Sequence, residues 1–277
     1  MQRSPVAKYA RGAVARLKRK LGGSREAHLE AELRATRRKL RKARTELREA
    51  RAQLASGLPP DIERTIAEAR AERLTYLKPA NLRELASIVQ QIERERLPGV
   101  VIEAGAARGG SAIVLAAAKA PERPMKVYDV FGMIPAPGEH DGADVHERYA
   151  KIAAGDARGV GGEKYYGYRD DLYREVGESF ARLGVPVEEN NVELIRGLFE
   201  DTIRLDEPVA FAHLDGDWYE STMTCLERIA PLLVPGGTIV LDDYYKWSGC
   251  RAAVDEYFAD RDGFRLEHRA KLRVVRD

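Results

Sequence analysis

Apolar positions along this chain follow two different patterns, and the change comes near residue 57. Beyond it, short apolar runs alternate with longer stretches in which apolar side chains recur every three or four residues. The runs predict strands at 100–104, 125–130, 192–196, 209–214 and 238–241, and the stretches predict helices at 82–92, 112–120, 171–183, 219–233 and 252–259. Strands that alternate with helices predict a parallel sheet with helices on both faces, which is the α/β class.

Two further apolar runs, 264–268 and 272–275, end the chain and predict a β-hairpin. The hairpin would add antiparallel strands to an otherwise mostly parallel sheet. Residues 56–60 read Ser-Gly-Leu-Pro-Pro and interrupt the periodic pattern, which marks a boundary. We therefore expect an N-terminal arm over 1–57 and an α/β domain over 58–277.

The first part of the arm, residues 5–21, has apolar side chains at helical spacing and basic side chains on the remaining surface. Such a basic amphipathic helix can lie on a membrane surface. A short arm that is only partly ordered, or a helix packed on a partner, would have the same pattern. The apolar face is rich in alanine and lacks Trp and Phe, which favours the second interpretation.

Leucines recur every seven residues over the second part of the arm. They are Leu33, Leu40, Leu47 and Leu54, with Leu29, Thr36, Ala43 and Ala50 between them. This heptad pattern predicts a short coiled coil that would join copies of the chain into a homo-oligomer. Since Thr and Ala give weak packing, a solvated single helix rich in Arg and Glu is the alternative.

Charge divides at the same boundary. Residues 1–57 carry 17 Lys/Arg and 5 Asp/Glu, whereas the remainder carries 29 Lys/Arg and 39 Asp/Glu. An acidic body argues against specific nucleic-acid binding, whereas the basic arm suits contact with anionic lipid, nucleic acid or an acidic partner. The chain has no apolar run of membrane-spanning length, no apolar signal-peptide core and only two cysteines, Cys225 and Cys250, without metal or disulfide spacing. We expect a cytoplasmic protein, peripheral to the membrane if the arm binds lipid.

The first predicted strand runs into a glycine-rich turn, Glu103-Ala104-Gly105-Ala106-Ala107-Arg108-Gly109-Gly110-Ser111. A strand, such a turn and a helix N-terminus together form a cradle for a nucleotide or cofactor. Ala107 replaces the middle glycine of the dinucleotide fingerprint, which S-adenosylmethionine would tolerate because it has no pyrophosphate. A tight turn without a ligand is the alternative.

Asp129 closes the second predicted strand, 26 residues beyond Glu103. An acid at this position commonly accepts hydrogen bonds from ribose hydroxyls. An aspartate that caps the following loop would look the same in the sequence. The glycine-rich turn before it favours the cofactor interpretation.

Two groups of carboxylates close the fourth and fifth predicted strands. Asp215 and Asp217 follow one strand, and Asp242 and Asp243 follow the other. Because the ends of neighbouring parallel strands share one crevice, we expect Asp215, Asp242 and Asp243 to converge. Such carboxylates repel one another unless a cation or protons neutralise them, and hard oxygen ligands suit Mg²⁺. Separately solvated turn and cap aspartates are the alternative.

The connection over about 131–170 is long and rich in Gly, Pro and Tyr. A connection of this length is usually a functional lid or is disordered. As a lid it would shield the reaction and select the acceptor. His140 and His146 within it are interpreted as surface residues rather than catalytic ones.

Together these segments resemble the macrocin O-methyltransferase family over 77–275, which leaves the coiled coil outside the resemblance. The residues that carry it are 101–105, 108–111, 129–132, the Leu-Asp-Gly-Asp-Trp-Tyr-Glu-Ser-Thr stretch at 214–222, and Pro235-Gly236-Gly237 leading to Asp242-Asp243-Tyr244. The resemblance implies a Rossmann-like methyltransferase sheet and Mg²⁺-dependent O-methylation of a sugar, with S-adenosylmethionine as methyl donor.

The resemblance also implies residue roles. Asp215, Asp242 and Asp243 would hold the metal. Apart from the resemblance, the mechanism that we expect makes Asp215 a candidate proton acceptor as well. The expected cofactor contacts are Glu103, Ala104, Gly105, Gly109, Gly110, Ser111, Asp129, Phe131, Ser179, Gly197 and Leu198. The lysine base of the related catechol methyltransferases is absent, because Trp218 occupies its position, so the base remains open.

The expected function is therefore methylation of a hydroxyl on a sugar, in a glycan or a glycosylated metabolite. Two alternatives remain at this point. One is a nicotinamide-dependent sugar-nucleotide oxidoreductase, which would use the same first turn but lacks a suitably placed Tyr-x-x-x-Lys pair. The other is a noncatalytic adaptor that the arm tethers to a membrane or a partner, which the intact acidic triad disfavours.

Overall fold

The computed structural model describes residues 28, 30–47, 49, 52–53 and 56–277. The chain divides into two compact units, Met1–Gly57 and Leu58–Asp277, and each is described by itself. In the first unit, residues 30–47 are helical. Leu33, Leu40 and Leu47 on this helix are 49%, 50% and 53% exposed, so the described part of the unit does not cover them. The coiled coil stays a prediction, and the helix expected over 5–21 lies outside the described residues.

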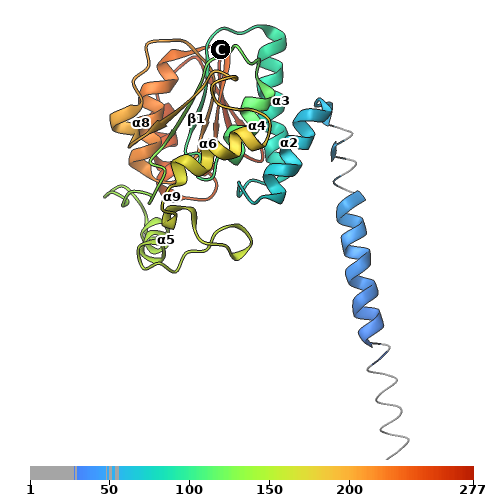
Figure 1. Ribbon diagram of the computed structural model, residues 1–277. Coiled ribbons are helices and arrows are strands. Elements are labelled where there is room, and N and C mark those ends of the chain that lie inside the picture. Colours follow the sequence, from blue (N-terminus) through green and yellow to red (C-terminus); the bar gives the residue numbers. More distant parts are fainter. Residues whose placement is uncertain (1–27, 29, 48, 50–51, 54–55) are drawn as a thin grey trace, which may run out of the picture. The chain divides into compact units, whose positions relative to one another are not determined.

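A seven-stranded sheet forms the centre of the second unit (Figure 1). Its order is β3-β2-β1-β4-β5-β7-β6, with β1 to β5 parallel and the hairpin β6–β7 antiparallel to them. The strands are β1 (Val100–Ala104), β2 (Met125–Asp129), β3 (Val192–Arg196), β4 (Val209–Leu214), β5 (Leu233–Leu241), β6 (Phe264–His268) and β7 (Leu272–Arg276). The predicted methyltransferase-type sheet is thereby confirmed.

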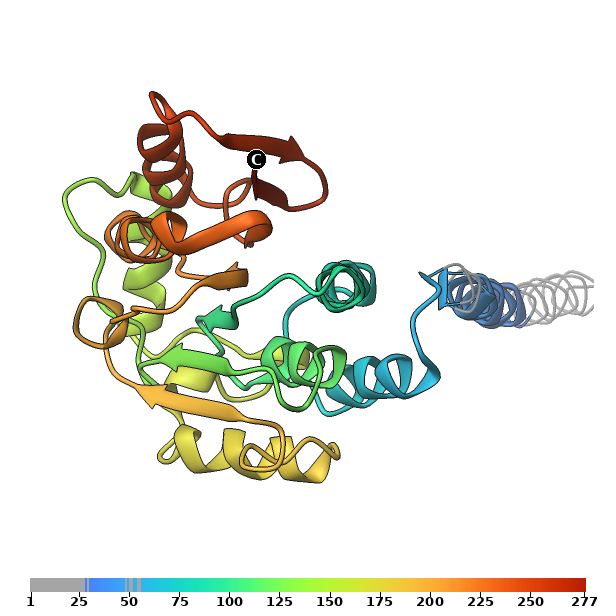
Figure 2. The ribbon, with the colours of Figure 1, turned by 90° about the horizontal axis from the view of Figure 1, so that it is seen from above.

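Helices cover both faces of this sheet, as predicted. They are α2 (Pro60–Ala71), α3 (Pro79–Glu95), α4 (Gly110–Ala118), α6 (Leu172–Arg182), α7 (Phe199–Thr202), α8 (Tyr219–Ile229) and α9 (Ser248–Phe258). A further helix, α5 (Ala143–Ala153), belongs to the connection over 131–170. Buried side chains of α2, α3, α4 and α6 make one core layer, and those of α8 and α9 make the other. Figure 2 shows α8 and α9 on one side of the strands and α3 and α4 on the other.

Several boundaries differ from the predicted ones for local reasons. The helix expected over 219–233 ends at Ile229, because Pro231 cannot continue it and a 3₁₀ turn, η3 (Ala230–Leu232), follows. Strand β5 begins at Leu233 rather than at 238, and its pairing with β4 shifts register between Val209 and Phe211. Helix α9 begins at Ser248, earlier than the expected 252.

Three helices were not predicted. Helix α2 buries Ile62, Ile66 and Ala69 at helical spacing, but its other positions are so polar that the apolar pattern is weak. Helix α7 has only four residues, too few for a periodic signal. Helix α5 lies within the connection over 131–170, where glycines and prolines flank it and hide it in the sequence.

The connection over 131–170 has a small core of its own. Ile134, Val145, Ile152, Ala157 and Tyr165 are buried there together with Trp218, the residue that precedes α8. Two 3₁₀ turns, η1 (Val160–Gly162) and η2 (Tyr166–Tyr168), follow α5. Asp141 and Asp144 join the connection to the domain, because they accept hydrogen bonds from the backbone N–H groups of Tyr219 (2.9 Å) and Ser248 (3.0 Å).

Candidate active site

The turn after β1 brings the ends of β1 and β4 into close contact. Gly105 has φ +96°, and a Cβ added there would lie 2.1 Å from the backbone oxygen of Asp215. Only glycine allows this approach, since any side chain would collide with the neighbouring backbone. The tight turn therefore fixes the position of Asp215 relative to the glycine-rich loop.

Asp129 at the end of β2 organises the same loop. One carboxylate oxygen accepts hydrogen bonds from the N–H groups of Ala106 (2.8 Å) and Ala107 (2.9 Å), and the other accepts one from Phe131 (2.6 Å). Burial nevertheless raises the pKa of Asp129, and these hydrogen bonds oppose the rise. The side chain caps the loop and also lines the cavity beside it.

Glu103 lies inside the sheet, and it does not line either cavity described below. One of its oxygens accepts the hydroxyl hydrogen bond of Ser111, and the other lies 2.9 Å from Nδ1 of His213. Nε2 of His213 lies 3.6 Å from Oδ1 of Asp242, which is an ion pair rather than a hydrogen bond. Burial lowers the pKa of His213, but Glu103 and Asp242 outweigh it and raise the pKa to about 10. Glu103 is thus joined to the acidic cluster through a charged histidine.

The acidic cluster forms as the strand order predicts. Asp215, Asp242 and Asp243 each offer a carboxylate oxygen, and these oxygens all lie within 4.8 Å of one another. Burial, and then the charges of Asp243 and Asp242, raise the pKa of Asp215 well above its usual range. Oδ1 of Asp242 and Oδ2 of Asp243 are buried and have no hydrogen-bond partner within the described chain. A buried carboxylate oxygen without a hydrogen bond is costly, so this cluster is suited to a cation.

Asp217 follows the same strand but has a different environment. It adopts φ +59°, and its carboxylate accepts a hydrogen bond from Nε1 of Trp247 (2.7 Å). Burial and the charge of Asp243 raise the pKa of Asp217 to about 8. The indole therefore holds Asp217 beside the cluster rather than within it.

Two lysines flank the acidic cluster. Nζ of Lys271 lies 2.7 Å from Oδ2 of Asp242, and Nζ of Lys246 lies 3.4 Å from Oδ1 of Asp243. Burial opposes the ionisation of Asp242, but His213 and Lys271 outweigh it and lower the pKa of Asp242 to about 2. The sequence analysis missed these lysines and His213, because single residues in separate segments give no local pattern.

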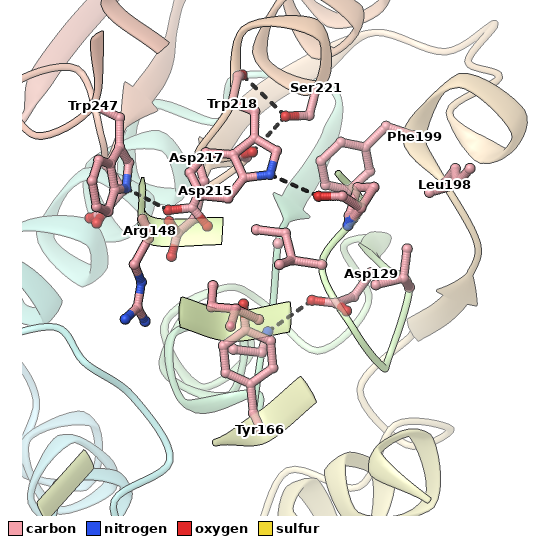
Figure 3. A pocket seen from close by; sticks show the side chains of 18 of the residues that line it. Asp129, Arg148, Tyr166, Leu198, Phe199, Asp215, Asp217, Trp218, Ser221 and Trp247 are labelled. Carbon is pink, nitrogen blue, oxygen red and sulfur yellow. Dashed lines mark hydrogen bonds between the residues drawn. The ribbon is translucent and has the colours of Figure 1, made fainter. Parts of the chain in front are cut away.

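Two cavities adjoin at the acidic cluster, and Asp215 and Asp242 line both of them. Figure 3 shows the first cavity, with Asp215 and Asp217 among the side chains that line it. The first extends over Gly105, Asp129 and Leu198 on one side and reaches the 131–170 connection on the other. The second includes Ser111 and the segment before α3. Residues of the first cavity that the sequence analysis missed are Tyr76, Arg148, Tyr165, Tyr166, Phe199, Lys246 and Trp247.

Several expected cofactor contacts lie outside both cavities. Gly110 packs against the backbone of Leu74, and its N–H donates to the Leu74 carbonyl (3.1 Å). Phe131 is buried against the ring of Tyr173. Ser179 lies within α6, and its hydroxyl donates to the carbonyl of Glu175 (2.8 Å). Ala104, Gly109 and Gly197 also line neither cavity. Gly109 and Gly197 instead shape turns beside the cavities, since they adopt φ +84° and +150°.

The sequence profile of the macrocin-O-methyltransferase (TylF) family matches residues 24–263. The chain belongs to this family. The match begins at residue 24 and so includes the segment of the predicted coiled coil, which the resemblance over 77–275 had left out. The demethyldecarbamoylnovobiocin O-methyltransferase of Streptomyces niveus is 30% identical over 199 residues, which cover 68% of this chain and 69% of that protein.

A second relative comes from Streptomyces olivaceus and is the 8-demethyl-8-(2,3-dimethoxy-alpha-L-rhamnosyl)-tetracenomycin-C 4'-O-methyltransferase. It is 32% identical over 182 residues, which cover 64% of each protein. Among solved structures, the O-methyltransferase NovP has a TM-score of 0.61 at 26% identity and covers 73% of this chain and 82% of its own. The calicheamicin methyltransferase CalS11, at 18% identity and a TM-score of 0.55, shares the fold.

As a member of this family, the chain is an O-methyltransferase that uses S-adenosylmethionine. The nicotinamide-dependent oxidoreductase considered from the sequence is thereby replaced. No described helix is both long enough and apolar enough to cross a membrane.

Proposed function

We propose that the chain methylates a hydroxyl group of a sugar, in a glycan or a glycosylated metabolite, with Mg²⁺ held by Asp215, Asp242 and Asp243. The observation that carries the proposal is the acidic cluster with two buried oxygens that have no hydrogen-bond partner among the described residues, Oδ1 of Asp242 and Oδ2 of Asp243. The name of the Streptomyces olivaceus relative, which places its methylation on a rhamnosyl tetracenomycin, supports a sugar as acceptor.

The donor set of the cluster fits Mg²⁺. Three carboxylates offer oxygen ligands only, and the described residues of the cluster include no thiol. When bound, Mg²⁺ would lower the pKa of a hydroxyl that it coordinates. His213 and Lys271 form ion pairs with Asp242, and such partners of a ligating carboxylate fix its orientation toward a metal.

The methyl donor would occupy the space on both sides of Gly105. Asp129 and Leu198 line the first cavity and are the proposed contacts of the adenosyl part. Ser111 and Thr75 line the second cavity, where the methionine part would lie. Glu103 serves this site by holding Ser111 and His213 in place rather than by contact with the donor.

The reaction requires an acceptor oxygen in line with the methyl group. The oxygen forms its bond to the methyl carbon while the carbon–sulfur bond of the donor breaks, and the hydroxyl proton passes to a base. Asp215 lines both cavities and is the proposed proton acceptor. The walls hold donor and acceptor in one geometry, and this positioning supplies much of the rate.

The connection over 131–170 is the proposed lid. Ile134, Ile152 and Tyr165 belong both to its small core and to the wall of the first cavity. Because these side chains both pack in the core of the connection and line the cavity, a movement of the connection would open the cavity to water. His140 lines neither cavity and pairs at the surface with Glu220 (2.9 Å), as expected of a noncatalytic residue.

The arm over 1–57 is proposed to act outside the reaction. Its net charge of +12 would attract the surface of an anionic membrane, and its exposed leucines would join two chains in a coiled coil. Flotation with anionic vesicles, with and without 1–57, tests the first role, and the mass in solution tests the second. Equal flotation, or an unchanged mass after truncation, would contradict the respective role.

Calorimetric titration of S-adenosylmethionine, first with Mg²⁺ and then with a chelator, followed by methyl transfer to a panel of sugars, tests the main proposal. We expect one-to-one donor binding in both conditions and transfer only with Mg²⁺. Transfer that persists at full rate in the chelator would refute the metal site, and donor binding without transfer to any sugar would refute the acceptor class.

A further inference from the structure

Arginines around the 131–170 connection fall into two groups. Arg73, Arg108 and Arg169 all point at one carboxylate, that of Glu163, at 2.8, 3.0 and 3.9 Å. Arg169 also pairs with Glu175 at 2.6 Å. Each of these three cations thus has a carboxylate partner within the protein, and these ion pairs tie the connection to the domain.

Arg148 of α5 is different. It is half-buried and lines the first cavity. In the part of the chain that the structure describes, no hydrogen bond or ion pair joins it to another residue, and its guanidinium carbon lies 5.8 Å from the centre of the Tyr165 ring. Figure 3 shows Arg148 on the side of Trp247 and Asp217, with Asp129 and Leu198 on the other side of the cavity.

The carboxylates of the same site, which could have paired with Arg148, already have other roles. Asp217 accepts the hydrogen bond of the Trp247 indole, and the cluster of Asp215, Asp242 and Asp243 is the proposed metal site. A guanidinium that is partly withdrawn from water without a counterion is unfavourable, and a cation–π contact offsets only part of that cost. The planar fork of arginine matches a carboxylate or a phosphate in two parallel hydrogen bonds.

The methionine carboxylate of the donor does not suit this position. The second cavity, where that part of the donor is proposed to lie, is lined by Thr75, Lys78, Asn81 and Ser111 and not by Arg148. Arg148 lines the first cavity, which the lid encloses and in which the acceptor must meet the methyl group. Its partner is therefore an acceptor group rather than a donor group.

We propose that the acceptor is an anionic sugar, one that carries a carboxylate or a phosphate, and that Arg148 binds this group. The inference rests on the proposed function, because it names the class of sugar that enters the same site. Arg148 is thus a residue that determines acceptor specificity, and it acts by direct contact with the substrate.

The test measures binding, which requires no turnover. Glucuronate, glucose 1-phosphate and methyl glucoside are titrated by calorimetry into the full chain with Mg²⁺ and saturating S-adenosylhomocysteine. We expect glucuronate or glucose 1-phosphate to bind on the order of tenfold more tightly than methyl glucoside, and Arg148→Gln to remove that difference. The two anionic sugars separate a carboxylate partner from a phosphate partner.

Two variants serve as matched controls. Lys151→Gln removes a positive charge from the exposed face of the same helix and should leave every affinity unchanged. Arg148→Lys keeps the charge without the fork and should retain part of the preference. Binding of S-adenosylhomocysteine to Arg148→Gln should equal that of the unchanged chain.

Three results would overturn the inference. The first is equal affinity for neutral and anionic sugars. The second is a preference for anionic sugars that persists in Arg148→Gln, because the anion then binds the metal. The third is a loss of S-adenosylhomocysteine binding in that variant. Failure of the proposed function looks different. Anionic sugars would then bind through Arg148 without any methyl transfer to a hydroxyl.

Discussion

Acidic residues stand at two places on the same edge of the sheet, and their surroundings are opposite. Near the ends of β1 and β2, the carboxylates of Glu103 and Asp129 have protein partners for both of their oxygens. At the ends of β4 and β5, Asp242 and Asp243 each keep a buried oxygen without a hydrogen-bond partner within the described residues. The protein itself satisfies the carboxylates of the first pair, whereas the second group has buried oxygens whose hydrogen-bonding capacity only a ligand would fill.

This difference teaches that residue type and strand position do not decide the role of a carboxylate. A buried acid that is fully hydrogen-bonded stabilises the fold, and its removal costs stability. A buried acid with an unpartnered oxygen lowers stability until a cation binds, and its removal costs activity. The two groups therefore predict opposite responses to the same isosteric substitution.

The largest expected effect is on turnover in Asp215→Asn. The variant loses a metal ligand and the proposed proton acceptor, so kcat should fall by about a thousandfold, as for loss of a preorganised electrostatic group. Donor binding should persist, and stability without metal should rise, because repulsion from Asp242 and Asp243 is relieved. Steady-state kinetics and thermal unfolding measure both, with the exposed Asp206→Asn as control. Near-normal turnover would exclude the role of Asp215.

Glu103→Gln should show the reverse. It removes the charge that faces the buried His213, so the free energy of unfolding should fall by about 3 kcal/mol. Chemical denaturation measures this, and Glu188→Gln at an exposed site should change the free energy by less than about 0.5 kcal/mol. A stability loss no larger than that of the control would mean that the pair does not support the sheet.

Mg²⁺ should stabilise the folded chain only through the acidic cluster of Asp215, Asp242 and Asp243. At about 100 times its dissociation constant, a ligand that binds only the folded state adds about 2.7 kcal/mol. Thermal unfolding with Mg²⁺, and with NaCl at equal ionic strength, measures the gain. We expect it to vanish in Asp243→Asn and to remain in Asp129→Asn. An equal gain in both variants would remove the distinction between the two groups.

The smallest expected effect, taken over a single pH unit, is a change in the free energy of unfolding with pH. His213 has a pKa raised from 6.5 to about 10 in the folded chain, chiefly by Glu103 and Asp242. The stabilisation that charged His213 gives the folded chain is fully present below pH 6.5 and is lost as the pH rises through about 10. Relative to His213→Gln, stability should fall on the order of 1 kcal/mol per pH unit between these values. A constant difference from pH 6 to pH 9 would show that His213 is not charged.

Local pattern in the sequence was sufficient for the sheet and for the acidic cluster. Short apolar runs bounded by turn residues predicted β1, β2, β3 and β4 to within a residue, although only β1, β2 and β4 are buried and β3 is partly exposed. Asp215, Asp242 and Asp243 could be brought together from sequence, because parallel strands next to one another end at one edge. The boundaries of α8 and β5 were missed where Pro231 and a register shift intervene.

The sequence by itself thus determined the fold class, the family and the carboxylates at the sheet edge, all of which depend on residues close together in the chain. Only the tertiary structure decided which carboxylates are already satisfied, because the partners of Glu103 and Asp242, namely His213 and Lys271, come from distant segments. It also decided that Arg148 lines the cavity without a hydrogen bond or ion pair to another described residue, since that depends on how α5 packs and on where the acids of the described chain lie. A side chain's partners are a property of three-dimensional packing, and a local pattern cannot contain them.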